Sequence, residues 1–407
     1  MNYVPIPIDR IEFGKPLPIN VWDQKGNLLL RKGQSIRSEQ HREALQAHQA
    51  CATEIDFKAW QRSYDRLVYT LLRQGASVAQ IAKASMPDTI ADADYAASHD
   101  IHGDWLDVQE VLTVVLSQGA SATHPLERID AVARRAMQLL EADTDDSLFT
   151  LFQALSDVSL GYSATHALLA AVLCELTARR LAVPDFVRPV LFLAALTMNI
   201  GMAKEQDKLA RQSAPPSRAQ RQVIRDHAQA GAAMLRNFGV ANEDWIELVG
   251  MHHETDETLG LARNLECRRI LRCADGFVAK IAARATRLGL SALGAAKAVL
   301  VSATGPQARV GSALATAVSF YPPGTYVALA NGEIAVSAQR GVAANTPMVV
   351  SAMHADGMPL GHYLLRDTSL SEFAIRSPVS PQRIRLKISA PQVRKALGKP
   401  PPRASLP

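Results

Sequence analysis

Histidines and acidic residues recur between residues 162 and 279, in segments whose apolar residues repeat with helical spacing. Imidazole and carboxylate groups are the side chains that most often bind divalent metals and transfer protons. A carboxylate on an apolar helix face is costly to bury unless a cation or hydrogen-bond donors accompany it. The candidate metal ligands are His166, His227, His252, His253 and Asp275.

The first two candidates lie on predicted helices. His166 is followed by apolar residues three, four, seven and ten positions later, which places it on the inner stripe of a helix. His227 lies in an apolar stripe from Ile224 to Phe238, near Gly231, where a small residue leaves room for another backbone or a ligand. Both imidazoles are therefore expected to point inward.

The remaining candidates lie on two further helical patterns. A short helix that starts near Trp245 is predicted to end in the triplet 252–254, which reads His-His-Glu. The pattern over residues 270–281 places Asp275 on the apolar face of a later helix. Between the first two histidines, residues 188–200 are apolar on nearly every side, which predicts a central helix that delivers Met198 and Asn199 to the core.

These polar residues could belong to one site or be separate core residues. A single histidine on an apolar helix face is more often a hydrogen-bonded core residue than a ligand. Four histidines and an aspartate on successive inner faces favour a shared site, because bundle interiors seldom collect so many polar groups without a common task.

The order and spacing of these motifs resemble the HD-GYP branch of the HD superfamily, over residues 145–340. Members are helical bundles that bind two or three metals, commonly iron or manganese, and hydrolyse the bacterial second messenger cyclic di-GMP. The resemblance implies a mainly α fold: an HD-type helical bundle with a small N-terminal α+β element and a short C-terminal antiparallel β segment. It rests on Tyr162-x3-His166, AALTMNIG, HAQAGAAML, HHETDETLG, RCADGFVAK and YPPGTYVALANGEIAV.

The chain departs from the family at the central His-Asp pair, where it has Met198-Asn199. The family aspartate bridges two cations, whereas Asn199 offers one neutral oxygen and Met198 a soft thioether that suits hard divalent metals poorly. A hydroxide held between two cations is then hard to form. The Gly-Tyr-Pro signature is also changed, because Gly260-Leu261-Ala262 aligns with it. We therefore assign no catalytic residue and regard Met198 and Asn199 as degenerate positions.

The family also suggests which residues bind the metal and the phosphate. His227, His252 and His253 would form one cation pocket, and three imidazoles suffice for a tetrahedral zinc-like site with a water in the fourth position. His166 and Asp275 would be remnants of the other pocket, so we expect at most one divalent metal, iron, manganese or zinc. The expected ligand-binding residues are Arg211, Lys204 or Lys208, and Gly260; the family glutamate before the third histidine is Gln220 here.

Composition sets broader limits. The 407 residues carry a formal net charge of +5 and are 48% apolar, enough for two or three domains with real cores. The sequence has no run of 18 apolar residues without charges or breakers and no signal-peptide pattern, which predicts a soluble cytoplasmic protein with no transmembrane segment. The four cysteines form no CxxC pair; Cys267 and Cys273 could approach the site, but plain packing is favoured.

We divide the chain into five segments. Residues 1–60 form a small hairpin and helix module, in which Ser38 caps a short helix and Gly26 lies in the turn; residues 61–104 form a helix and a polar linker. The literal His99-Asp100 pair lies in that linker and lacks an apolar helix that would bury it. Residues 105–320 form the HD-GYP-like domain, 321–376 a short β segment with an Asn331-Gly332 turn, and 377–407 a basic, proline-rich tail.

The tail is expected to be solvated, and no pattern indicates a specific nucleic-acid site. Its basic residues lack acidic neighbours; with Arg376 they are Arg383, Arg385, Lys387, Arg394, Lys395, Lys399 and Arg403.

Three functions stay open. The favoured one is a cyclic di-GMP signalling protein with impaired hydrolysis, which binds cyclic di-GMP or a related nucleotide, or docks other signalling proteins. The second is an active single-metal phosphohydrolase, with Glu254 or Asp275 as base. The third is a pure interaction scaffold. The sequence does not determine the oligomeric state.

Overall fold

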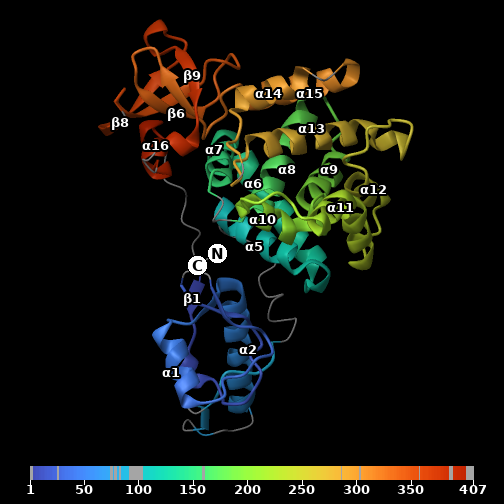
Figure 1. Cartoon of the computed structure of the whole chain (residues 1–407), viewed down its shortest axis with the longest axis vertical. Helices are drawn as coiled ribbons and strands as arrows, with labels where there is room; N and C mark the ends of the chain where they lie inside the picture. Colours follow the sequence, from blue (N-terminus) through green and yellow to red (C-terminus); the bar gives the residue numbers. More distant parts are fainter. Residues whose placement is uncertain are drawn as a thin grey trace. The chain divides into compact units, whose positions relative to one another are not determined.

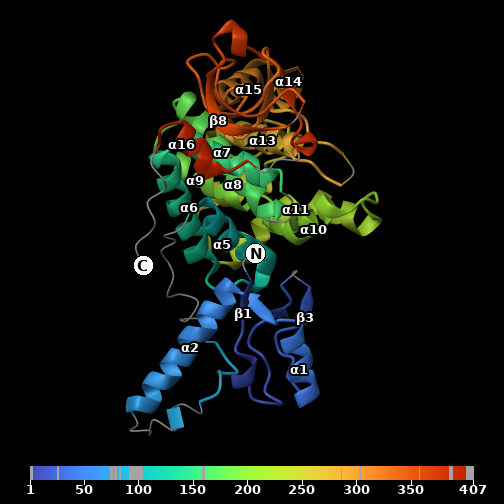
Figure 2. The same cartoon turned by 90° about the vertical axis from the view of Figure 1, so that its left-hand side faces the viewer.

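The computed structural model forms two compact units, Met1–Asp100 and Ile101–Pro407, which are described separately (Figures 1 and 2). The literal His99-Asp100 pair of the predicted linker lies outside the described residues. Among the residues that are described, no helix is both long and apolar enough to cross a membrane. The described residues are 3–24, 27–73, 77, 80–81, 84–90, 104–157, 161–285, 287–301, 304–356, 358–384 and 388–399.

The first unit is a small α+β module. Its four-stranded sheet has the order β1-β4-β2-β3, with β1 at Tyr3–Pro5, β2 at Val21–Trp22, β3 at Leu28–Leu30 and β4 at Cys51–Thr53. The predicted hairpin is present as the antiparallel β2–β3 pair. Its expected turn glycine, Gly26, lies outside the described residues.

The two helices of this unit show why it extends beyond residue 60. Helix α1, Glu39–Ala47, is capped as predicted by Ser38, whose side chain accepts a hydrogen bond from His41 N. Helix α2, Glu54–Arg73, begins before the expected boundary. Trp60 is buried in the core of the unit, and its indole donates to Pro87 O at 2.6 Å. The division placed after residue 60 therefore falls inside α2.

Helix α8, Tyr162–Arg180, is the centre of the second unit. It packs against α5, α7, α9, α10, α13 and α15 (Figure 1). Nearly every side chain along it is buried. Alanines on several of its sides allow these neighbours to approach closely. The surrounding helices are α5 (Trp105–Gln118), α6 (Pro125–Ala142), α7 (Thr144–Leu155), α9 (Arg188–Thr197), α10 (Ala203–Arg211), α11 (Arg218–Asn237), α12 (Glu243–Gly250), α13 (Leu265–Ile281), α14 (Ala292–Val301) and α15 (Gly305–Val318).

Helix α9 differs from the expectation that it is the central helix. Its inner face is buried, but Pro189 is exposed and Val190 and Leu193 are only partly buried. The helix ends at Thr197, and a 3-10 turn at Ile200–Met202 follows. An apolar sequence therefore indicated burial correctly but did not show which helix is surrounded on all sides.

The chain after α15 forms a five-stranded antiparallel sheet of order β8-β7-β6-β5-β9. Asn331 and Gly332 make the turn between β5 and β6, where Gly332 has a φ of +88° that favours glycine. The mainly α fold with an N-terminal α+β element and a C-terminal antiparallel segment is thus confirmed. The strands are β5 (Tyr326–Leu329), β6 (Ile334–Gln339), β7 (Met348–Met353), β8 (Pro359–Asp367) and β9 (Ile375–Val379).

The basic tail is folded wherever it is described, unlike the solvated segment expected from its composition. It supplies strand β9 and helix α16, Ala390–Ala396, whose Val393 is buried in the core between the sheet and α7. Arg394 Nε lies 2.7 Å from Asp146 Oδ1, and Lys399 Nζ lies 2.6 Å from Asp143 Oδ2. The acidic start of α7 thus provides the partners that the tail lacks locally. Arg385, Lys387 and Arg403 lie outside the described residues.

Glu333 and Arg366 provide a test of the sheet by pH. Two hydrogen bonds from Arg366, of 3.0 and 2.8 Å, lower the pKa of Glu333 from 4.5 to about 2. The pair should therefore stabilise the sheet fully above pH 4.5, and lose this effect as the pH falls toward 2. We expect Glu333→Gln to cost about 1 kcal/mol at pH 7, because the pair is partly solvated, and progressively less below pH 4.5 in thermal melts. If the stability of Glu333→Gln stayed a constant amount below that of wild type from pH 7 to pH 3, this role of the ion pair would be contradicted.

Candidate metal centre

His227 and His252 face each other inside the helical unit, with Nε2 atoms 3.2 Å apart. The Nδ1 atom of His227 lies 2.7 Å from Ile224 O, and that of His252 lies 2.7 Å from Val249 O. A carbonyl oxygen can only accept, so each Nδ1 carries the ring proton. In the neutral rings both Nε2 atoms then present lone pairs, and neither can donate to the other.

A cation between the rings would resolve this opposition. Two imidazole nitrogens on one tetrahedral zinc ion are about 3.3 Å apart, given zinc–nitrogen distances of about 2.0–2.1 Å. His253 completes the set, since the candidate ligand atoms of the three histidines all lie within 4.8 Å of one another. His253 is exposed, whereas the other two are buried, so the site opens to solvent on one side.

Burial keeps the first two imidazoles in the form that binds metal. It lowers the pKa of His227 below 6.5 and, together with the neighbouring His253, lowers the pKa of His252 to about 3. Both rings are therefore neutral near pH 7, as metal binding requires. The donor set fits a divalent cation.

Close backbone packing places His227 against the turn that follows Asn199. A Cβ atom on Gly201 would lie 2.3 Å from His227 O and 2.7 Å from Gly231 N. Gly201 therefore allows the Ile200–Met202 turn to contact α11 directly. This contact brings the predicted Met198-Asn199 pair next to the helix that carries His227.

The end of α9 is also fixed to α12, the helix that leads to His252. The indole of Trp245 donates to Thr197 Oγ1 at 2.8 Å, and the Thr197 hydroxyl donates to Leu193 O at 2.8 Å. Asn242 caps α12 by accepting from Trp245 N at 3.0 Å. These bonds fix the residue before Met198 relative to the short helix that ends just before the two histidines.

Met198 and Asn199 are both buried, as predicted. Asn199 Oδ1 has no hydrogen-bond partner within the described part of the chain. A buried oxygen left without a donor costs about 1–3 kcal/mol. A buried oxygen of this kind, next to the helix that carries His227, is an additional neutral ligand atom that could coordinate a cation.

His166 and Asp275 form a pair of their own. His166 Nε2 lies 2.8 Å from Asp275 Oδ1, and its Nδ1 lies 3.2 Å from Tyr162 Oη. Burial alone would raise the pKa of Asp275, but the hydrogen bond and charge of His166, with contributions from His252 and His253, lower it. Among the described residues, the cluster of mutually close ligand atoms contains only the three other histidines.

Sequence reasoning missed a cation beside this pair. The guanidinium of Arg284 lies 5.8 Å from the centre of the Tyr162 ring. Arg284 follows α13 in an irregular segment, so no helical pattern marked it. In the sequence, the only indication that Arg284 lies near the site is its position a few residues after the helix that carries Asp275.

The predicted phosphate ligands lie on α10, with exposed side chains at Lys204, Lys208 and Arg211. Lys208 pairs with Glu205. The same helix positions His166, because Asp207 Oδ1 accepts from Ser163 N at 2.7 Å at the start of α8. Whether these cations bind a phosphate stays a prediction.

Four other residues singled out in the sequence have structural roles or are simply buried. Gln220 completes the capping box of α11 by accepting from Ser217 N at 2.9 Å. Burial raises the pKa of Cys267 to about 11 and that of Cys273 to about 12, so both remain thiols rather than metal-binding thiolates. Gly260 has a φ of +75° and packs against Glu247 and Arg268.

The contact at Gly201 can be tested by one methyl group. Gly201→Ala should destabilise the helical unit by about 2–3 kcal/mol, because the new Cβ would overlap backbone atoms that cannot move aside. Gly276→Ala is the matched control, since the nearest atom to its Cβ would be the flexible Lys280 Nζ at 3.7 Å; as a helical glycine it should gain up to about 1 kcal/mol. Chemical denaturation followed by circular dichroism measures both. A wild-type midpoint for Gly201→Ala would contradict the close approach of turn and helix.

Comparisons with known proteins give little beyond this geometry. No protein-family model matches the sequence, and no curated protein matches it. One similar solved structure is described as Bd1817, a HDG"Y"P protein from Bdellovibrio bacteriovorus, with 16% identity and a TM-score of 0.41. The alignment covers 77% of this chain and 98% of that one. At this distance, function follows only from the site itself.

Proposed function

We propose that this protein holds one divalent cation on His227, His252 and His253 and acts in cyclic di-GMP signalling as a nucleotide-binding or protein-docking regulator with impaired hydrolysis. The observation that carries the cation is the pair of opposed Nε2 atoms, 3.2 Å apart, whose partner nitrogens are both bonded to carbonyls. Hydrogen-bonded core histidines would not need this arrangement. It therefore favours the metal site over the pure scaffold.

The second half of the site supports impaired hydrolysis. A two-metal phosphodiesterase needs a bridging carboxylate, and Met198 and Asn199 supply none. The acid that remains, Asp275, is hydrogen-bonded to His166 at 2.8 Å. A single bound cation would still lower the pKa of a water, but without a second cation to stabilise the leaving oxygen.

Nucleotide binding is the part of the proposal that rests on the resemblance to HD-GYP proteins. The exposed cations Lys204, Lys208 and Arg211 lie on α10, which is bonded to the start of the His166 helix. Arg284 adds a positive charge beside Tyr162. A cyclic dinucleotide with two phosphates would find complementary charge on these residues.

A working single-metal phosphohydrolase is the second candidate, because His253 is exposed. Three imidazoles with a solvent-facing fourth position are also the arrangement of catalytic zinc sites. The weakness of this second candidate is its general base, because both carboxylates considered for that role already accept hydrogen bonds. Glu254 Oε1 accepts from Thr255 N and Asp256 N, both at 2.8 Å, and Asp275 is bonded to His166.

Metal stoichiometry tests the cation site directly. Wild-type protein should bind one equivalent of zinc or manganese, and His253→Ala should weaken binding at least about 100-fold, more than loss of an outer-shell partner would. The control variant, His354→Ala, removes an exposed histidine from the connection between β7 and β8, and it should bind the metal like wild type. Titration calorimetry with metal-free protein measures all three. If wild type binds no stoichiometric cation, the metal site is refuted and the scaffold is favoured.

Restoring the family pair tests the impaired chemistry. With iron or manganese under anaerobic conditions, wild type should bind cyclic di-GMP without cleaving it, whereas Met198→His/Asn199→Asp should bind more metal and gain turnover. Adding His227→Ala to the restored protein should abolish the gain. Turnover by wild type at an enzyme-like rate would overturn impaired hydrolysis and leave the single-metal enzyme. If neither wild type nor the restored protein bound cyclic di-GMP, the nucleotide-binding role would be refuted and the protein-docking role would remain.

A further inference from the structure

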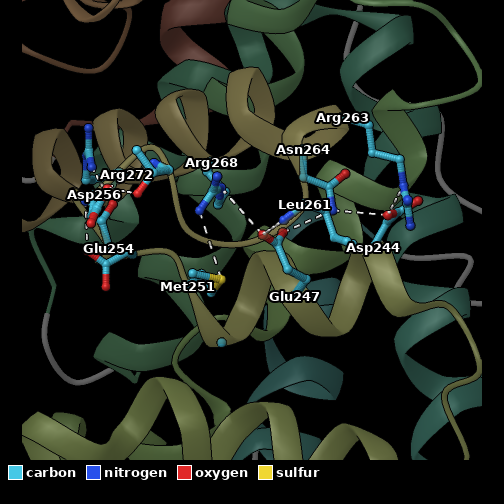
Figure 3. A network of polar contacts seen from close by, with 12 residues as sticks. Asp244, Glu247, Met251, Glu254, Asp256, Leu261, Arg263, Asn264, Arg268 and Arg272 are labelled. Atoms are coloured by element: carbon cyan, nitrogen blue, oxygen red, sulfur yellow. Dashed lines mark hydrogen bonds and ion pairs between the residues drawn. The ribbon is translucent and has the colours of Figure 1, made fainter.

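Buried polar contacts connect α12 and α13 around the loop that carries the two adjacent histidines (Figure 3). Arg268 on α13 is buried and Glu247 on α12 is nearly so, with side chains 5% and 11% exposed, and Arg268 Nε lies 3.5 Å from Glu247 Oε1. A buried ion pair contributes little net stability, because desolvation offsets its attraction. The relevance of this pair therefore lies in what it holds in position rather than in its net attraction.

Glu247 holds the far end of the loop. Its Oε1 accepts from Leu261 N at 3.1 Å, and its Oε2 accepts from Asn264 Nδ2 at 3.0 Å. Gly260 makes this approach possible, since a Cβ atom there would lie 2.4 Å from Glu247 Oε1. The carboxylate thus fixes the backbone where the loop enters α13.

Arg268 reaches the near end of the same loop. Its Nη1 lies 4.0 Å from the sulfur of Met251, the residue directly before His252. Arg268 and Asp275 are seven positions apart, so they share one face of α13. One turn after Arg268, Arg272 Nη1 donates to Glu254 O at 2.5 Å, directly after His253.

We propose that Glu247 and Arg268 are positioning residues that clamp both ends of the 251–264 loop and so set the spacing of His252 and His253 for the cation. This inference rests on the proposed metal site. The clamp explains how two histidines outside regular helix, one of them exposed, can be held at ligand spacing. Arg272 extends the clamp to Glu254, the residue that follows the two histidines.

Arg268→Met tests the clamp, with Arg263→Met as the matched control. Arg263 belongs to the same network but pairs with Asp244, and its side chain is 63% exposed. Arg268→Met should weaken binding of zinc about tenfold or more, as loss of outer-shell partners does, whereas Arg263→Met should stay within about twofold. With cobalt in place of zinc, the visible spectrum should change for Arg268→Met alone.

Amide hydrogen exchange on metal-free protein separates the clamp from the metal site. Residues 251–261 should exchange faster in Arg268→Met than in Arg263→Met, whether or not a metal binds. Equal exchange and equal zinc affinity in the two variants would overturn the clamp. If wild type bound no zinc, the metal site would fail, and exchange alone would decide whether the loop is clamped. If Arg268→Met did not fold, Arg268→Lys and Glu247→Gln should show the same changes at smaller size, and wild-type values for both would refute the inference.

Discussion

The rest of the site depends on two buried imidazole nitrogens, His227 Nε2 and His252 Nε2, whose lone pairs face each other. Each of His227 and His252 uses its only proton on a carbonyl of the preceding helical turn, so their free lone pairs face each other across 3.2 Å. Nothing in the pair itself relieves that repulsion. A cation between the rings would relieve it, whereas burial disfavours a proton there by lowering the pKa of both imidazoles.

The surrounding elements serve to keep these rings in place. Gly201 lets the turn after α9 contact the backbone of α11, and Trp245 bonds the end of α9 to α12. The Glu247–Arg268 pair holds the loop that follows α12. Each of these contacts connects two different elements, and each ends within a few residues of a candidate ligand. The site is therefore held by tertiary contacts on its buried side and is open to solvent at His253.

The two halves of the site are unequal. Three histidines have uncommitted nitrogens, whereas His166 and Asp275 already satisfy each other. Asn199 contributes a buried oxygen that has no hydrogen-bond partner among the residues described, but its neutrality removes the charge that would hold two cations together. This asymmetry suits one bound cation and a binding role better than two-metal chemistry.

Local patterns in the sequence predicted which residues face inward and in what kind of element. The apolar stripe around His227, the Ser38 cap and the Asn331-Gly332 turn depend on neighbours a few positions away, and local spacing reports such features. It could not show that α8 is the surrounded helix, because periodicity defines a face but not what packs on it. It also missed the docked tail, whose partners Asp143 and Asp146 lie some 250 positions earlier. The pairing of Asp275 with His166 and the facing of the two free Nε2 atoms of His227 and His252 could be seen only in the folded chain, because both depend on contacts between different helices.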